Sequence, residues 1–139
     1  MIEPVNAMGV GSPVFAARNL TRGTELARRV KLADSFGARF MGLMGRPSLS
    51  SGGGLLLTGT SNIHMLFMRF SIDAVFLGRA AADGSRRVAA VYARLRPWFG
   101  VVWFARGADW CLELPAGTAA ASGTVVGDVV AMVREPGSD

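Results

Sequence analysis

The chain contains very little lysine, histidine or cysteine. Among its 139 residues, Lys31 is the only lysine, His64 the only histidine and Cys111 the only cysteine. A single cysteine excludes an internal disulfide and a thiolate metal cluster. Cys111 lies in the strand-like segment WCLEL. We interpret it as a buried thiol rather than a nucleophile, because free cysteine packs as a small apolar side chain.

Long apolar runs are also missing. Hydrophobic residues make up 50% of the chain and its mean hydropathy is +0.34. No uninterrupted apolar run approaches the roughly 18–20 residues of a membrane-spanning helix. The first residues, MIEPVNAMGVGSPVF, carry Glu3 and Pro4 where a secretory signal would carry positive charge. We therefore predict a cytoplasmic protein without a transmembrane segment.

The positive charge of the chain is large but dispersed. The net charge is +5 and the isoelectric point is about 11.0, with arginine supplying nearly all the basic residues. This composition is typical of a GC-rich bacterial genome. Apart from the pairs Arg28-Arg29 and Arg86-Arg87, the arginines are separated along the chain. Nucleic-acid-binding domains usually gather basic residues on one face, so the pattern argues against nucleic acid as the partner.

Strand-like segments dominate the chain. Alternating apolar and polar residues, or short runs that are apolar at every position, are typical of strands. Asp83-Gly84 predicts a hairpin turn between two of them. We predict one domain over residues 14–134, with a flexible leader at 1–13 and a polar tail at 135–139. The predicted strands are 14–19 at a sheet edge, 25–33, 55–57, 72–77, 86–95, 108–114 and 124–133, with a single helical turn at 118–122 before the last.

One longer segment has helical spacing. Apolar residues recur every three or four positions from Phe36 to Met44 and form a single stripe. Asp34 or Ser35 can cap the first turn of this segment, and Gly45 can end it. The sequence therefore predicts one principal α-helix near residues 35–45.

The segment Ser61–Gly78 holds polar residues in an unusual setting. Within it, residues 72–77 are apolar on both faces except at Asp73, a pattern typical of a central, buried strand. Burying an unpaired carboxylate costs several kcal/mol or forces its protonation. Asp73 must therefore be met by a cation or by backbone amides.

Three motifs follow one another along the chain and carry a family resemblance. They are RFMGLMGR at 39–46 with GGLLL at 53–57, IHMLFMRFSIDAVFL at 63–77, and LELPAG at 112–117 with Gly127-Asp128 near the end. In this order and spacing they resemble the DUF192 family of uncharacterised prokaryotic proteins, also written UPF0127. Two positions depart from the family pattern: Ser71 stands where proline is frequent, and Trp98-Phe99 lies where relatives carry Pro-Trp-Arg.

The resemblance implies a fold but no activity. It implies a mainly β domain, a β-sandwich or distorted barrel that is largely antiparallel, with one principal helix. That architecture agrees with the strands and the helix predicted from the residue pattern. Because the family has no assigned reaction, catalytic and ligand-binding roles have to be argued from the residues themselves.

Polar residues in the matching motifs are the candidates for a ligand-binding site. Arg39 can pair with Asp73 through two parallel hydrogen bonds, either in a binding site or as a structural clamp between helix and sheet. Glu113 can face solvent or brace a loop amide, and Asp128 is most simply a turn residue. The primary candidates are Arg39, His64, Arg69 and Asp73, and the secondary candidates are Glu113 and Asp128.

An enzymatic role needs more than these residues supply. Hydrolysis would require His64 to be oriented by an acid and to face a nucleophile, and no nucleophile motif is present. A metal centre needs three or more ligands, and no spacing brings His64, Asp73 and Glu113 together. We therefore assign no catalytic residue, metal or cofactor. We favour non-catalytic binding of a small polar or anionic ligand, or a peptide, in a cleft around His64 and Asp73, with an enzyme using these two residues as the alternative.

The aromatic segment Trp98–Phe104, WFGVVWF, supports two interpretations. It is either a strand or flap that covers one end of the core, or an exposed apolar patch for a partner, a second copy of the chain or a membrane surface. The second interpretation predicts an interaction domain that self-associates through Trp98, Phe99, Trp103 and Phe104.

Overall fold

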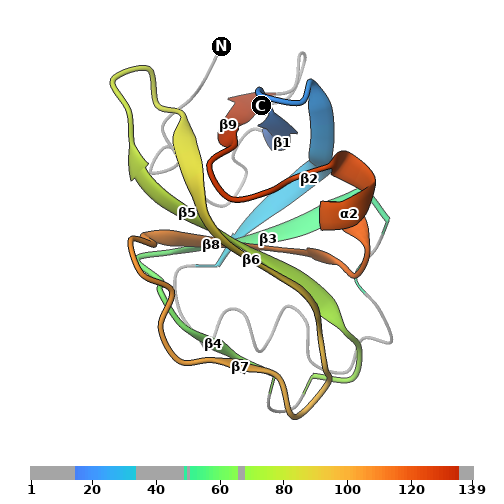
Figure 1. Cartoon of the computed structure of the whole chain (residues 1–139). Helices are drawn as coiled ribbons and strands as arrows, with labels where there is room; N and C mark the ends of the chain where they lie inside the picture. Colours follow the sequence, from blue (N-terminus) through green and yellow to red (C-terminus); the bar gives the residue numbers. More distant parts are fainter. Residues whose placement is uncertain (1–14, 34–48, 50, 66–67, 135–139) are drawn as a thin grey trace.

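The computed structural model describes residues 15–33, 49, 51–65 and 68–134. Over these ranges the chain is mainly β, with one short helix (Figure 1). The elements are β1 (Phe15–Asn19), β2 (Thr24–Ala33), β3 (Gly53–Thr58), β4 (Ile63–His64), β5 (Ile72–Ala80), β6 (Arg86–Leu95), β7 (Val101–Val102), β8 (Trp110–Pro115), α2 (Thr118–Ser122) and β9 (Val129–Arg134). The predicted principal helix near residues 35–45, the leader and the tail lie outside the described residues.

Seven of the described strands close into a barrel. Their order is β1, β2, β3, β8, β5, β6, β9, and β9 pairs back onto β1. Neighbouring strands are antiparallel except for β2 and β3, which are parallel. This confirms the mainly β, largely antiparallel fold and identifies it as a barrel. The prediction of an edge strand at 14–19 is wrong, because closure gives β1 a partner on each side.

The predicted central strand is confirmed as the buried middle of the sheet. β5 pairs with β6 on one side and with β8 on the other, and residues 72–77 are all buried. Val75 and Leu77 belong to one apolar cluster, whereas Ile72 and Phe76 belong to another. Both faces of the strand are therefore covered, as its doubly apolar sequence predicts.

Two apolar cores lie on opposite sides of the barrel wall. The barrel core takes side chains from all seven barrel strands, among them Phe15, Leu56 and Val130. The outer core contains Phe76 and Cys111 together with Ile63 of β4 and Val102 of β7. β4 and β7 pair as a separate two-stranded sheet that lies at the lower end of the molecule in Figure 1. Cys111 is buried, as predicted.

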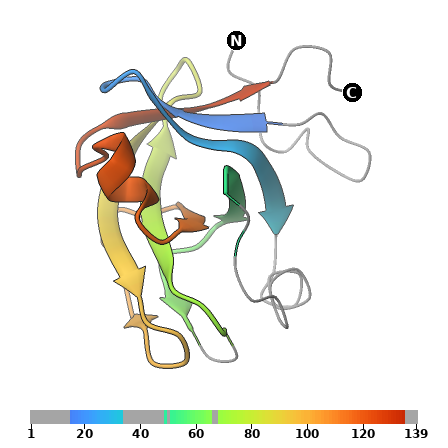
Figure 2. The ribbon, with the colours of Figure 1, turned by 90° about the vertical axis from the view of Figure 1, so that its right-hand side faces the viewer.

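The strand β6 has the predicted bounds, and most of its residues are not fully buried. Only Val88 is fully buried, while Tyr92 is exposed and the strand's other residues are half-buried or exposed. Its apolar residues contact both cores, Val91 the barrel core and Ala90 the outer core, but both side chains remain half-buried. Figure 2 shows β5 and β6 extending from the barrel to the lower end of the molecule, where the chain continues toward β7.

The C-terminal part follows the prediction with one shift. The helical turn α2 ends at Gly123, which adopts φ 72°, as a glycine C-cap should. The last strand begins at Val129 rather than at residue 124, because residues 125–128 form a tight turn in which the N–H of Asp128 donates to the carbonyl of Val125. Among all the residues that the structure describes, no helix has the length and apolar character needed to cross a membrane.

Candidate functional site

Asp73 is fully buried and bound by backbone amides. Its exposed fraction is 0%. Oδ1 accepts a hydrogen bond from the N–H of Arg94 at 2.8 Å, and Oδ2 accepts from the N–H groups of Gly117 at 3.1 Å and Ala119 at 2.8 Å. Three donors replace the water that burial removes from a carboxylate. The requirement for a cation or amides is therefore met by amides.

These three bonds join β5, β6 and α2. Arg94 adopts a left-handed φ of 54°, and the β5–β6 register shifts opposite Asp73, between Ile72 and Ala74. The N-cap residue of α2, Gly117, offers no side chain to the free amides of the first turn. Asp73 supplies that cap from another strand and holds the bulge in β6. We interpret Asp73 as a structural bracket.

The three amides that bind Asp73 belong to none of the other predicted site residues. Arg69 is exposed and His64 is half-buried. Glu113 lies in β8 with an exposed fraction of 0%, so our alternative that it faces solvent is wrong. The neighbours of Glu113 in β8, Leu112 and Leu114, belong to the barrel core. Because side chains alternate along a strand, that of Glu113 points to the other side of the barrel wall. Arg39 lies outside the described residues, so its pairing with Asp73 stays a prediction.

Asp128 lies at the centre of a polar network that the sequence did not predict. Its Oδ2 accepts hydrogen bonds at 3.0 Å from both Asn19 Nδ2 and Arg22 Nε, and the N–H of Val125 donates to the same oxygen at 3.1 Å. The hydrogen bond from Arg22, followed by that from Asn19, lowers the pKa of Asp128 from 3.8 to about 2. The turn after β1 is thereby tied to the turn before β9, which gives the network a structural role.

The aromatic segment presents its large side chains to solvent. Val102 and Ala105 face the outer core and are buried. The residues between and before them point outward and form what we call the aromatic surface: Trp98 (46% exposed), Phe99 (79%), Val101 (40%), Trp103 (86%) and Phe104 (66%). The small side chains therefore cover the core, whereas the large ones do not. The exposed-patch interpretation describes these side chains better than the flap.

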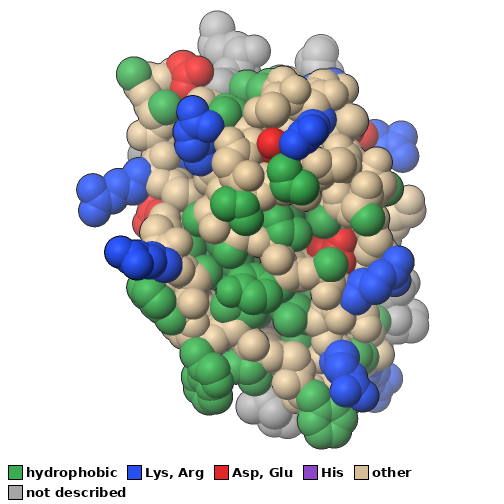
Figure 3. Space-filling view, in the orientation of Figure 1, with side chains coloured by type: hydrophobic (Ala, Val, Ile, Leu, Met, Phe, Trp, Pro, Cys, Tyr) green, Lys and Arg blue, Asp and Glu red, His purple; other side chains and the backbone are tan. Residues whose placement is uncertain are grey.

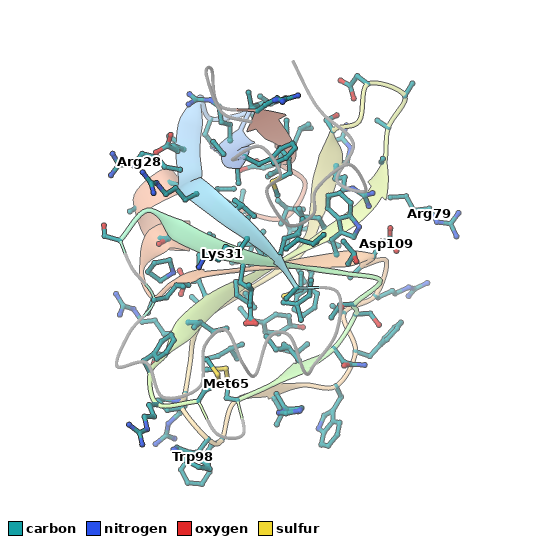
Figure 4. The ribbon with its side chains drawn as sticks, turned by 180° about the vertical axis from the view of Figure 1, so that it is seen from behind. Arg28, Lys31, Met65, Arg79, Trp98 and Asp109 are labelled. Carbon is teal, nitrogen blue, oxygen red and sulfur yellow. The ribbon has the colours of Figure 1, made fainter. Side chains whose placement is uncertain are left out.

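The backbone that carries the aromatic surface is hydrogen-bonded to the segment around β4. Met65 donates to the carbonyl of Gly100 at 2.8 Å and accepts from the N–H of Trp98 at 2.9 Å. Ala105 donates to the carbonyl of Ser61 at 2.6 Å. Met65 is itself fully buried, and Figure 4 shows it just inside the projecting Trp98. The exposed side chains therefore stand on a fixed support.

Trp98 adopts a backbone conformation that a bulky residue rarely takes. Its φ is 66°, in the left-handed region, which costs an L-residue roughly 1–2 kcal/mol relative to a right-handed conformation. Gly100 is constrained in a different way, by space: a Cβ there would lie 2.9 Å from the carbonyl oxygen of Arg96. Strained residues of this kind concentrate at functional sites. The strain at Trp98 therefore marks this end of the molecule as the candidate site.

The stretch of sequence that carries the aromatic surface contains arginine but no acidic residue. Residues 85–108 contain five arginines and no aspartate or glutamate. Arg94, Arg96 and Arg106 are exposed in the stretch that carries the aromatic side chains. Figure 3 shows hydrophobic side chains projecting at the lower end of the molecule, with basic side chains beside them. The described residues hold no group of three or more His, Cys, Asp or Glu placed to bind a metal ion.

Comparison with known proteins identifies a family rather than an activity. The family model DUF192, described as "Uncharacterized ACR", matches residues 17–132. A UPF0127 protein of the archaeon Thermococcus sibiricus is 36% identical over 116 residues, which cover 81% of this chain and 71% of that protein. A second UPF0127 protein, from Pyrococcus furiosus, is 34% identical over 113 residues, covering 79% and 91% of the two chains.

Two solved structures share the fold. A protein of unknown function from Novosphingobium aromaticivorans gives a TM-score of 0.70 at 24% identity, covering 94% of this chain and 90% of that one. A protein from Sinorhizobium meliloti 1021, named as a candidate transcription regulator, gives a TM-score of 0.68 at 21% identity, covering 86% and 92%. At these identities the likeness concerns the fold alone.

Proposed function

Because this chain belongs to the DUF192 family, for which no activity is assigned, we propose from its own geometry that it is a non-catalytic binding domain. The contact surface in this proposal is the aromatic surface. The observation that carries it is the exposure of four aromatic side chains on a hydrogen-bonded support that includes the strained Trp98. Large apolar side chains left exposed at one end of a domain mark it as a candidate interaction site.

The burial of Asp73 argues against acid–base catalysis with His64. A general acid or base must reach the proton that it transfers, directly or through one water. Both oxygens of Asp73 are occupied by backbone amides and its side chain is inaccessible. An enzyme that uses His64 would therefore need an acid other than Asp73.

A small polar or anionic ligand, or a peptide, near His64 and Arg69 is the second candidate. The pairing of His64 with Val101 places its backbone beside the aromatic surface, and Arg69 is exposed. Thermal unfolding with inorganic phosphate and with a panel of anionic metabolites tests this candidate. A ligand that raises the midpoint in the wild type but not in Arg69→Gln would support it, and no shift with any compound would contradict it.

Sedimentation velocity over a range of concentrations tests the proposed contact surface. Without its partner, an exposed apolar surface should cause weak self-association of the wild type. We expect this association to be lost in Trp98→Ser/Trp103→Ser. A matched control, Val125→Ser/Val126→Ser, removes two exposed apolar side chains (48% and 63% exposed) from the turn before β9 and should behave as the wild type. Identical concentration dependence in all three proteins would contradict the proposal.

A further inference from the structure

We propose that the aromatic surface docks this domain onto an anionic lipid bilayer. This inference rests on the proposed function and names the partner. The chain would lie on the membrane as a peripheral domain, with the aromatic side chains at the level of the lipid headgroups and the neighbouring arginines on the lipid phosphates.

The side chains of the aromatic surface suit the boundary between lipid and water. Tryptophan and phenylalanine combine a large apolar area with a shape that fits among headgroups, and tryptophan adds an indole N–H for a polar partner. Trp103 and Phe99 are the most exposed of the set, at 86% and 79%. In water this apolar area is unfavourable, whereas insertion to headgroup depth would remove it from water.

The charges around the aromatic surface complement an anionic membrane. Arg96 and Arg106 flank the aromatic segment in the sequence and are exposed, whereas the guanidinium group of Arg94 lies near Gly117, at the start of α2. A guanidinium group binds phosphate oxygens through two parallel hydrogen bonds. The absence of aspartate and glutamate from residues 85–108 means that no carboxylate of this stretch repels the lipid phosphates. Each basic residue near an anionic membrane should raise binding about fivefold at moderate salt.

The shape of this end favours a membrane over a single-stranded nucleic acid, which also uses arginine and aromatic side chains. Nucleic-acid strands lie in basic grooves lined by stacking aromatics. The hydrophobic side chains here project from the lower end of the molecule instead (Figure 3), and Trp98 points outward from it (Figure 4). Projecting side chains can enter a flat bilayer. Their support is fixed by the bonds to Met65 and Ser61, so binding should require little ordering of the chain.

Vesicle co-sedimentation with the full chain tests the inference. The probes are vesicles of phosphatidylcholine alone and vesicles containing about 30% phosphatidylglycerol, an anionic lipid. We expect the wild type to bind the anionic vesicles at least about tenfold more strongly than the neutral ones. Raising the salt from about 0.1 M to about 0.5 M should weaken this binding, because salt screens the charges. Equal binding to both kinds of vesicle would contradict the proposal that the partner is an anionic membrane.

Matched variants separate the aromatic and basic contributions. Trp98→Ser/Trp103→Ser should lose at least about tenfold in binding. Phe99→Ser/Phe104→Ser should lose binding as well, and it provides the test if the tryptophan variant folds poorly. Arg96→Gln/Arg106→Gln should lose about tenfold or more on anionic vesicles and little on neutral ones. Arg29→Gln/Arg79→Gln removes the same charge elsewhere and should leave binding nearly unchanged; Figure 4 places Arg79 far from Trp98.

The outcomes distinguish the partner from the surface. If the wild type fails to bind anionic vesicles but self-associates through the tryptophans, the membrane inference is wrong and the proposed contact surface stands. If the aromatic variants match the wild type in both assays, both proposals are wrong. If the protein binds a single-stranded oligonucleotide through the tryptophans and does not bind vesicles, the membrane inference is wrong and the partner is a nucleic acid.

Discussion

At the scale of single residues, the buried carboxylates of Asp73 and Asp128 serve the fold. Asp73 joins β5 to β6 and α2 through three backbone amides. Asp128 joins the turn after β1 to the turn before β9 through Asn19 and Arg22. Both are therefore expected to affect stability before they affect binding.

Replacing Asp73 by alanine should destabilise the protein strongly. The change leaves three amides without their acceptor, one of them in a buried bond and two in partly buried bonds. A hydrogen bond to a charged group contributes roughly 1.5–3 kcal/mol. We expect Asp73→Ala to lower the free energy of unfolding by about 3 kcal/mol, measured by urea denaturation. Glu25→Gln, which removes two exposed ion pairs of Glu25, with Arg18 and with Arg28, should change the free energy of unfolding little. A loss below about 1 kcal/mol for Asp73→Ala would show that the bracket is not required.

The contribution of Asp128 should depend on pH in acid. Its pKa is lowered from 3.8 to about 2 in the folded state by its hydrogen bonds to Arg22 and Asn19. A carboxyl group with a lowered folded pKa stabilises the protein above its unfolded pKa and loses that effect as the pH falls through the folded pKa. The stability difference between the wild type and Asp128→Asn should therefore be full above pH 3.8 and shrink toward pH 2. A difference that stays constant over this range would contradict the assigned interaction.

At the scale of elements, the aromatic segment separates support from contact. Its backbone and its small residues hold the segment on the outer core, whereas its large side chains contribute little to that packing. Stability and binding should then respond to different substitutions within the same seven residues, Trp98–Phe104.

Substitutions of Trp98 can measure the strain of its left-handed backbone. Glycine adopts φ 66° without the Cβ penalty, whereas alanine does not. Trp98→Gly and Trp98→Ala both remove the indole, so their difference isolates the backbone conformation. We expect the glycine variant to be more stable than the alanine variant by about 1 kcal/mol in urea unfolding. Equal stability, or a more stable alanine variant, would mean that the backbone at this position is not strained.

The architecture follows from the sequence where the pattern is local. The doubly apolar segment at residues 72–77 predicted the buried β5, and Asp83-Gly84 predicted the hairpin that leads into β6. The turn at 118–122 and its glycine stop were also visible in the sequence. These features depend on residues a few positions apart, which a pattern along the chain can report.

The site could be predicted only in part, because its partners are distant in sequence. The need of Asp73 for donors was evident, but the donors lie 21, 44 and 46 residues away and are backbone amides, which no residue type reveals. Asn19 and Arg22 lie more than 100 residues from Asp128. The outward direction of the aromatic side chains likewise depends on the pairing of β4 with β7. Barrel closure has the same long-range character.

At the scale of the whole molecule, the central claim is that this domain makes its contacts through the end that carries β4 and β7. The three tryptophans of the chain can test it. Trp98 and Trp103 belong to the aromatic surface, whereas the half-buried Trp110 lies against Arg86, whose guanidinium carbon is 3.3 Å from the ring centroid.

The most direct measurement is fluorescence quenching by spin-labelled phospholipid in anionic vesicles. Trp98→Phe/Trp110→Phe leaves Trp103 as the only emitter, and Trp98→Phe/Trp103→Phe leaves Trp110. On vesicle-bound protein we predict strong quenching of Trp103 by a label near the headgroup and almost none of Trp110. Quenching of Trp110 as strong as that of Trp103, or of neither while the protein is bound, would contradict contact through the aromatic surface.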